Sequence, residues 1–236
     1  MKRTKLVSPL PDPGVPLARP ADHQLLSRTV ADWLARRIIT GEEPPGARLT
    51  EPKIAELAGV SRSPVREALR ILARDGLVEI LPRLGAQVAA IGVDDARGLY
   101  ACRMLLEPGC ARLAVEALTP ADVLELDAIR AAMEAAVERE DPRRFLDHNI
   151  AYFRTLLGHC PNPTLRELVE LTWNKSVRYW SIFARLPQYG RGSLVQHALL
   201  HDAVHRADGP VAEQADRTIL ERALAEVVHT LEAKEA

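Results

Sequence analysis

The spacing of apolar residues divides the chain into three parts. Residues 1–20 contain five prolines and no periodic apolar pattern, so they cannot form a regular element and are expected to be a flexible arm. Residues 21–92 open with apolar positions at the spacing of an amphipathic helix that ends at Gly41. Residues 93–236 show helical spacing only. We therefore expect an arm, a first domain and an all-helical second domain.

Two short helices are predicted in the first domain after Gly41. Thr50 is a suitable N-cap for a helix over residues 50–58, which Gly59 ends. The next helix begins near Ser61, because Pro64 is tolerated only in a first helical turn. Its apolar stripe repeats at i, i+4 and i+7 in Val65, Leu69 and Leu72.

Two β-prone runs follow, over residues 77–81 and 86–91, and they flank a turn over residues 82–85. Helix, glycine-containing turn, second helix with a polar start and β-hairpin together indicate a winged helix-turn-helix.

The second of these helices carries an arginine at every fourth position, on a face away from the apolar stripe. The four are Arg62, Arg66, Arg70 and Arg74. Ser61 and Ser63 add hydroxyls at the helix start, where the dipole also favours phosphate. Such a face suits phosphate oxygens and guanine edges. A solvent-facing arginine stripe is the alternative, and the preceding helix and turn favour the DNA-binding interpretation.

Six helices are predicted in the second domain, separated by short connections that contain proline or glycine. They cover residues 94–117, 120–139, 141–158, 163–184, 193–207 and 210–232. Connections this short favour antiparallel neighbours and therefore a helical bundle. The predicted fold class is mainly α, with a winged helix-turn-helix over residues 21–92 and an all-α bundle over residues 93–236.

Composition limits the class of protein. With 47% hydrophobic and 27% charged residues among 236, the chain is typical of soluble globular proteins. No apolar run approaches the roughly 18 residues of a membrane span, and no apolar signal segment follows Met1, so we expect a cytoplasmic protein without a membrane partner. Three cysteines without CxxC spacing predict neither a disulfide framework nor a thiolate zinc site.

Charge is divided unequally along the chain, although the formal net charge is only −1. Residues 1–90 hold 14 Lys and Arg against 10 Asp and Glu, whereas residues 91–236 hold 17 against 22. The excess positive charge therefore lies in the part with the helix-turn-helix, as DNA binding requires.

The run from Gly41 to Val88 resembles the winged-helix domain of the GntR family of bacterial transcription regulators. The resemblance is carried by Pro44–Leu49, Leu57–Leu69 and Gly76–Val78. It implies binding to double-stranded operator DNA through matching positions of the second helix, namely Ser61, Arg62, Ser63 and Arg66.

Three further DNA contacts are expected outside that helix. The wing glycine of the family corresponds to Gly85, which lets the hairpin tip approach the minor groove, and Arg83 lies in the same turn. Many members have an arginine where this chain has Pro52, so Lys53 is expected to replace that contact.

The second domain resembles the FCD ligand-binding domain of the FadR branch of the GntR family. The matching runs are Arg103–Glu107, Asn149–Phe153 before Asn162, and His197–Val204 before Asp208. Six helices are similar to the shorter VanR-type arrangement. The resemblance implies a homodimer that binds a small-molecule effector, often an organic acid.

Many FCD domains hold a divalent metal through one Asp and three His. The matching positions here are Asn149, Phe153, His197 and Ile219. Phe and Ile have no lone pair and Asn offers a weak neutral oxygen, so no metal and no other cofactor is expected there.

His197, His201 and His205 repeat at i, i+4 and i+8 in the fifth predicted helix. Two histidines four residues apart can chelate a metal, but the drift over eight residues turns His205 outward, and the sequence fixes no acidic partner. His197 and His201 are therefore interpreted as polar groups of an effector site, with structural histidines and a metal site as the alternatives.

The proposed effector site contains a few polar groups among aromatic ones, as small-molecule sites usually do. Its residues are Arg103, Asn149, Phe153, Trp173, Arg178, His197 and His201. Arg103 is the first choice as the cation for an acid and Arg178 the second. Core aromatics with an Arg103–Glu107 ion pair are the alternative.

No enzyme is predicted, because the chain has no GxSxG motif, no P-loop and no intact metal set. The predicted function is a ligand-responsive, sequence-specific transcription regulator, interpreted as a repressor. An effector-independent dimeric DNA-binding protein, whose helical domain only dimerises, is the alternative.

Overall fold

The computed structural model of the chain describes residues 23–81, 85–183 and 189–235. Contacts group them into two units. The first comprises the residues up to Ile91 together with Asn174–Ser181, and the second comprises Gly92–Trp173 and Ile182–Ala236. The expected flexible arm, residues 1–20, lies outside the described residues.

Three helices form most of the first unit: α1 (His23–Ile39), α2 (Glu51–Ala58) and α3 (Arg62–Arg74). The apolar faces of α1 and α2 pack against α3, whose stripe of Val65, Leu69 and Leu72 is buried. Gly59 ends α2 in the left-handed conformation, with φ of 64°, and therefore allows the sharp turn into α3. The predicted helix-turn-helix is confirmed.

The predicted wing is a three-stranded antiparallel sheet. Its strands are β1 (Arg48–Leu49), β2 (Val78–Leu81) and β3 (Gly85–Val88), in the order β1-β3-β2. Leu81 pairs with Gly85 at the hairpin and Leu49 pairs with Ala86 on the other side. The two residues of β1 were not predicted as a strand, because a run this short shows no alternation.

The second unit consists of helices, as predicted. They are α4 (Val93–Val115), α5 (Pro120–Glu138), α6 (Pro142–Gly158), most of α7 (Pro163–Ser176), α9 (Tyr189–Arg206) and α10 (Gly209–Glu235). Helices α4 and α10 lie side by side along much of their length, and α5 packs against α6 and α9. Thr119 and Asp122 form a capping box at the start of α5, which fixes where that helix begins.

The prediction of one continuous helix over residues 163–184 is wrong. Helix α7 ends at Ser176, a 3₁₀ turn η1 (Val177–Tyr179) follows, and α8 begins at Trp180 and is described as far as Phe183. The tighter 3₁₀ turn changes which side chains share a face, and Val177, Tyr179 and Trp180 are all buried. Among the described residues, no helix is both long and apolar enough to cross a membrane.

Candidate functional site

The start of α3 presents its polar side chains to solvent. Ser61, Arg62 and Ser63 are exposed, whereas Val65 and Ala68 on the opposite face are buried. Ser61 is the N-cap residue, but its side chain makes no capping hydrogen bond. The exposed helix start therefore offers hydroxyl groups, backbone N–H groups and a guanidinium to an anion.

Arg66 is held in place by Glu51 of α2. Its Nε donates to Oε1 at 2.7 Å and its Nη2 donates to Oε2 at 2.8 Å. The hydrogen bond from Arg66 lowers the pKa of Glu51. A guanidinium has five N–H groups, so this pair orients Arg66 and leaves other donors for a second partner.

Lys53, the expected substitute for a family arginine, is exposed on α2 but does not carry an isolated charge. Its Nζ lies 3.4 Å from Glu43, which also pairs with Arg37. Arg83 of the wing lies outside the described residues.

Gly85 has a structural reason to be glycine, besides any contact with DNA. Its φ is +91°, and a Cβ placed there would lie 3.1 Å from the carbonyl oxygen of Leu49 in the neighbouring strand. A larger residue would strain the backbone and press on the strand pairing.

The second unit contains a buried ion pair on α4. Arg103 Nε donates to Glu107 Oε2 at 2.9 Å and Nη2 donates to Oε1 at 3.0 Å. Trp173 Nε1 also donates to Glu107 Oε1 at 3.0 Å. The Arg103 guanidinium lies over the rings of Tyr100 and Trp173, with centroid distances of 5.1 and 5.7 Å. Charge, hydrogen bonds and aromatic faces thus hold Arg103 rigidly.

Asp216 of α10 is completely buried near this pair, and sequence reasoning missed it. Neither carboxyl oxygen has a hydrogen-bond partner among the described residues. Burial, followed by the negative charge of Glu107, raises its pKa well above the ordinary value, which favours the neutral acid. A signal existed in the sequence: Asp216 lies four residues after Ala212 and four before Leu220, on the buried stripe of α10.

Phe153 and His197 continue the buried site from Trp173. The Phe153 ring lies 6.1 Å from the Trp173 ring and meets the His197 ring edge-on at 5.0 Å, measured between centroids. His197 Nε2 lies 3.3 Å from Ser193 Oγ. Burial lowers the pKa of His197 to about 3, so its imidazole is neutral at physiological pH.

Two buried atoms of this region also lack partners among the described residues. They are His197 Nδ1 and Asn149 Oδ1, the latter one helical turn before Phe153 on α6. An unsatisfied buried polar atom costs on the order of 1–3 kcal/mol. Groups of this kind are suited to binding a ligand or water that supplies the missing hydrogen bonds.

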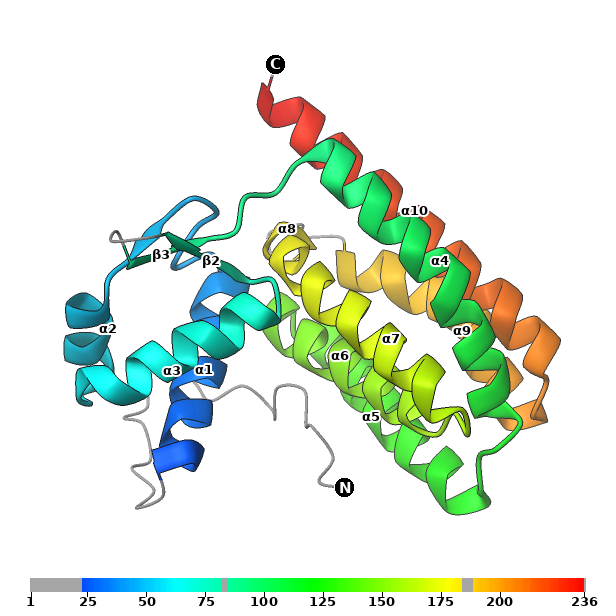
Figure 1. Cartoon of the computed structure of the whole chain (residues 1–236). Coiled ribbons are helices and arrows are strands. Elements are labelled where there is room, and N and C mark those ends of the chain that lie inside the picture. The colour runs from blue at the N-terminus through cyan, green and yellow to red at the C-terminus, as the bar shows by residue number, and fades with distance from the viewer. Residues whose placement is uncertain (1–22, 82–84, 184–188, 236) are drawn as a thin grey trace. The chain divides into compact units, whose positions relative to one another are not determined.

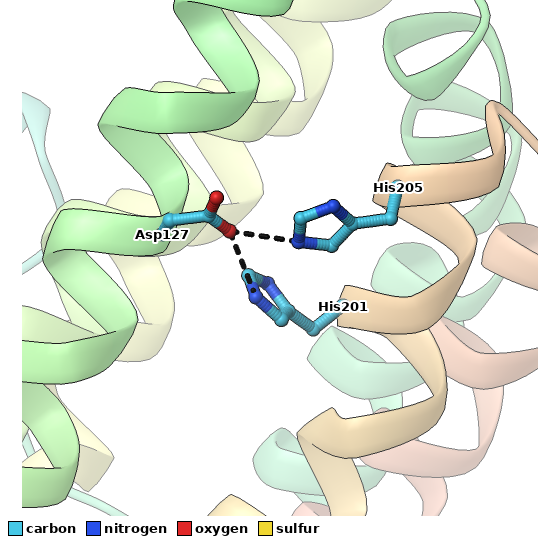
Figure 2. Close-up of side chains that lie close together, drawn as sticks. All are labelled: Asp127, His201 and His205. Carbon is cyan, nitrogen blue, oxygen red and sulfur yellow. Dashed lines mark hydrogen bonds and ion pairs between the residues drawn. The ribbon is translucent and has the colours of Figure 1, made fainter.

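The structure therefore brings together five of the seven predicted effector residues and separates two. Arg103, Asn149, Phe153, Trp173 and His197 belong to the buried site. Arg178 lies in η1, in the first unit, with its guanidinium over the Tyr179 ring. His201 faces Asp127 of α5, and so does His205 (Figure 2). His205 is exposed on α9, as expected from its outward position, but its Nε2 still reaches Asp127, a partner that the sequence could not fix, because α5 packs against α9 there.

Comparisons with known proteins match both units. Residues 26–88 match the family "Bacterial regulatory proteins, gntR family", and residues 98–222 match the FCD domain. The HTH-type transcriptional regulator McbR of Escherichia coli K12 is 33% identical over 152 residues, which are 64% of this chain and 68% of that protein. The galactonate operon transcriptional repressor of the same organism is 29% identical over 218 residues, covering 79% of this chain and 90% of the repressor.

Solved structures agree with the sequence comparisons. The structure of E. coli McbR/YncC matches with a TM-score of 0.78 and 26% identity, and the match covers 87% of this chain and 98% of that one.

Proposed function

The chain belongs to the bacterial GntR family and combines its DNA-binding domain with an FCD domain; from this premise we propose that it is a repressor controlled by a small acid. It is a transcription regulator, as its relatives are, and not an enzyme. The proposal concerns three further properties of the chain: its operator contacts, the pairing of two copies and the nature of the effector.

The operator contacts are proposed at the start of α3. Ser61, Arg62 and Ser63 are exposed there, and Glu51 orients the guanidinium of Arg66. One recognition helix reads few base pairs, so two copies related by a two-fold axis would read a pseudopalindromic operator.

Pairing is proposed through an exposed apolar face of α4. Leu105 is 81% exposed, and Ala101 and Cys102, about one turn earlier, are exposed as well. A leucine this exposed on a long helix suits contact with another apolar surface. Light scattering should give twice the 26.0 kDa chain mass, and Leu105→Glu should shift the protein toward the monomer. A wild-type monomer at micromolar concentration, with and without DNA, would contradict the proposal.

The effector site is proposed at the buried Arg103–Glu107 pair, and the observation that carries it is the pair's unsatisfied neighbour Asp216. Asn149 Oδ1 and the carbonyl oxygen of Asp216 accept hydrogen bonds, His197 Nδ1 accepts when its proton is on Nε2, and the neutral Asp216 acid also has one O–H to donate. A ligand that fits these atoms must bring donors together with an acceptor for that O–H. Arg103 uses two of its five N–H groups on Glu107, so it can also receive a carboxylate.

A small hydroxylated acid meets both requirements. Its carboxylate would bind Arg103, and its hydroxyl groups would donate to the atoms that lack partners. One relative is named as the repressor of a galactonate operon, and galactonate is an acid of this chemical class. The Phe153 and Trp173 rings would exclude water from the ligand and strengthen these hydrogen bonds.

We propose that the site works without a metal at the four family positions. Asn149 and His197 could offer donors, but Ile219 is apolar and the Phe153 ring packs edge-on against His197. Asn149 and His197 alone supply too few ligands for a zinc-type site.

Thermal unfolding with matched ligands tests the effector proposal. A hydroxy acid at about 100 times its Kd should stabilise the folded chain by about 2.7 kcal/mol and raise Tm by several degrees. The corresponding deoxy acid and the uncharged polyol should each have a smaller effect. The double variant Arg103→Gln/Glu107→Gln removes both charges together, and it should lose the response to the acid.

The result also decides between two functions. Operator binding that no acid or polyol changes, in a chain whose Tm none of them shifts, would favour a dimeric DNA-binding protein without an effector. Retention of the acid response in the double variant would place the acid elsewhere in the chain.

A further inference from the structure

A second polar cluster in the helical unit joins α5 to α9. His201 Nε2 lies 3.1 Å from Asp127 Oδ1, and His205 Nε2 lies 2.8 Å from the same oxygen. Figure 2 shows the two imidazole rings, from successive turns of α9, converging on this carboxylate. The donor atoms of the three residues all lie within 4.8 Å of one another.

The geometry points to a divalent transition-metal site of the zinc class, formed by Asp127, His201 and His205. This site shares no residue with the family metal positions, and of the residues predicted for the effector site it contains only His201, which the structure separates from the Arg103–Glu107 pair. The inference does not depend on the effector proposal.

The distances are close to those of a tetrahedral site. Zinc bonds of 2.0–2.1 Å to nitrogen and oxygen place neighbouring ligand atoms about 3.3 Å apart. The two distances to Asp127 Oδ1 are therefore short of this value by only a few tenths of an ångström. The two imidazoles must also approach each other, and the i, i+4 spacing on one helix permits this, as in other helical histidine pairs.

The donor types and their exposure also suit such an ion. Two imidazoles and one carboxylate are zinc ligands, and three protein ligands leave one position for water or another small ligand. The His201, Asp127 and His205 side chains are 15%, 35% and 48% exposed. An ion can reach the cluster from solvent, while the inner histidine remains sheltered.

Tyr152 supports His201 from the other side of the ring. Its hydroxyl, on a side chain that is 1% exposed, lies 3.0 Å from His201 Nδ1. With a metal on Nε2, Nδ1–H would donate to this hydroxyl, and such outer hydrogen bonds orient metal-binding histidines. Without a metal, Nε2–H can donate to Asp127 and the Tyr152 hydroxyl can donate to Nδ1.

The nearby charges do not prevent binding. Arg130 contributes positive charge near His201, but it forms an ion pair with Glu134 at 3.1 Å. A bound ion would be coordinated by the Asp127 carboxylate and the two imidazoles, and it would link α5 to α9.

The test is metal titration of the tag-free full-length chain after removal of bound ions with a chelator. Cobalt(II) serves as the spectroscopic probe and Zn²⁺ as its competitor. We expect one equivalent of Co²⁺ to give the absorption of a tetrahedral site, Zn²⁺ to displace it, and Zn²⁺ to raise Tm.

Matched variants assign the ligands. Asp127→Asn and His205→Gln should each weaken Zn²⁺ binding by more than about 100-fold, and Tyr152→Phe by about tenfold, since outer partners are worth 10- to 100-fold. His229→Gln removes an exposed histidine of α10 and should change nothing. Circular dichroism shows whether each variant remains folded.

Three outcomes would overturn the inference. The first is that the wild type takes up no stoichiometric metal. The second is that folded Asp127→Asn and His205→Gln bind Zn²⁺ with the affinity of the wild type. The third is that His197→Gln loses the ion whereas Asp127→Asn keeps it. The last would assign the metal to the buried site, and it would contradict the metal-free effector proposal as well. The first two leave the effector proposal unchanged, and the ligand series measures the hydroxy-acid response separately.

Discussion

Two arginine–carboxylate pairs with the same geometry lie in opposite environments. Arg66 and Glu51 join α3 to α2 on the surface of the first unit, with side chains 59% and 26% exposed. Arg103 and Glu107 lie on one helix of the second unit, with side chains 7% and 1% exposed. Both pairs have two parallel hydrogen bonds of 2.7–3.0 Å.

The difference lies in what happens when a partner is lost. Water can replace either partner of the surface pair at little cost, and the N–H groups of Arg66 that Glu51 does not use can donate to a DNA phosphate or a base. Water cannot easily replace Glu107, so Arg103 keeps its position and can only add a ligand to the existing pair. The same chemistry thus provides an exchangeable contact in one unit and a fixed anchor in the other.

Breaking the buried pair should have the largest effect on stability. Glu107→Ala leaves the Arg103 charge and the Trp173 N–H without their partner, and should lower the free energy of unfolding by about 3–5 kcal/mol. Urea denaturation followed by circular dichroism measures this loss. Glu213→Ala, which removes a partly exposed partner of Arg112, is the control and should cost no more than about 1 kcal/mol. Equal losses would mean that burial does not distinguish the two kinds of pair.

Replacing Asp216, the unsatisfied neighbour of the buried pair, should instead stabilise the chain near neutral pH. The pKa of Asp216 is raised in the folded state, so its favourable contribution is present below the unfolded pKa and is lost as pH rises toward the folded pKa. Asparagine does not ionise, so the Asp216→Asn variant does not lose this stability as pH rises. Its advantage over the wild type should be visible at pH 7 and should disappear below about pH 4. A constant difference at every pH would show that ionisation of Asp216 is not its cause.

On the exposed side, Arg62→Ala and Arg66→Ala should weaken specific operator binding without unfolding the protein. A good arginine contact to guanine is worth about 1–3 kcal/mol, or roughly 5- to 150-fold in affinity. Gel shifts at one salt concentration measure the change. Arg74→Ala, at the far end of the same helix, controls for the loss of one positive charge. If neither variant differs from this control, α3 is not the recognition helix.

The smallest effect should come from Glu51→Gln, which frees Arg66 without removing it. We expect stronger non-specific binding at low salt, because a negative charge is lost near DNA, and a smaller ratio of specific to non-specific affinity, because Arg66 is no longer oriented. The hydrogen bond from Arg66 lowers the pKa of Glu51, so its stabilisation is present above the unfolded pKa and is lost as pH falls through the folded pKa. In Arg66→Ala, an NMR titration should find the pKa of Glu51 closer to its ordinary value.

The sequence predicted what depends on local pattern. The N-cap position at Thr50, the Gly59 turn and the apolar stripe of α3 lie within a few residues of what they determine, and those elements are where they were expected, although the Thr50 side chain makes no capping hydrogen bond. The Arg103–Glu107 pair is also local, since i and i+4 share a helix face.

The sequence could not predict contacts that depend on how distant helices pack. Glu51 and Arg66 are 15 residues apart, and Asp127 and His205 are 78 apart. The position of Asp127 opposite the α9 histidines follows from the packing of α5 on α9, which no spacing encodes. The break after Ser176 escaped for a related reason, because the burial of Val177 and Tyr179 in the first unit depends on tertiary contacts.

The unsatisfied polar atoms of Asp216, Asn149 and His197 also bear on how long the regulator lasts in a cell. A chain with unmet hydrogen bonds in its interior opens more often than one whose site is filled, and cellular proteases cleave opened chains. We therefore expect the effector to lengthen the half-life of the protein as well as to change its affinity for the operator. A cell without effector would then degrade its regulator faster. When the effector returned, the response of the cell would depend on how much regulator had been synthesised in the meantime.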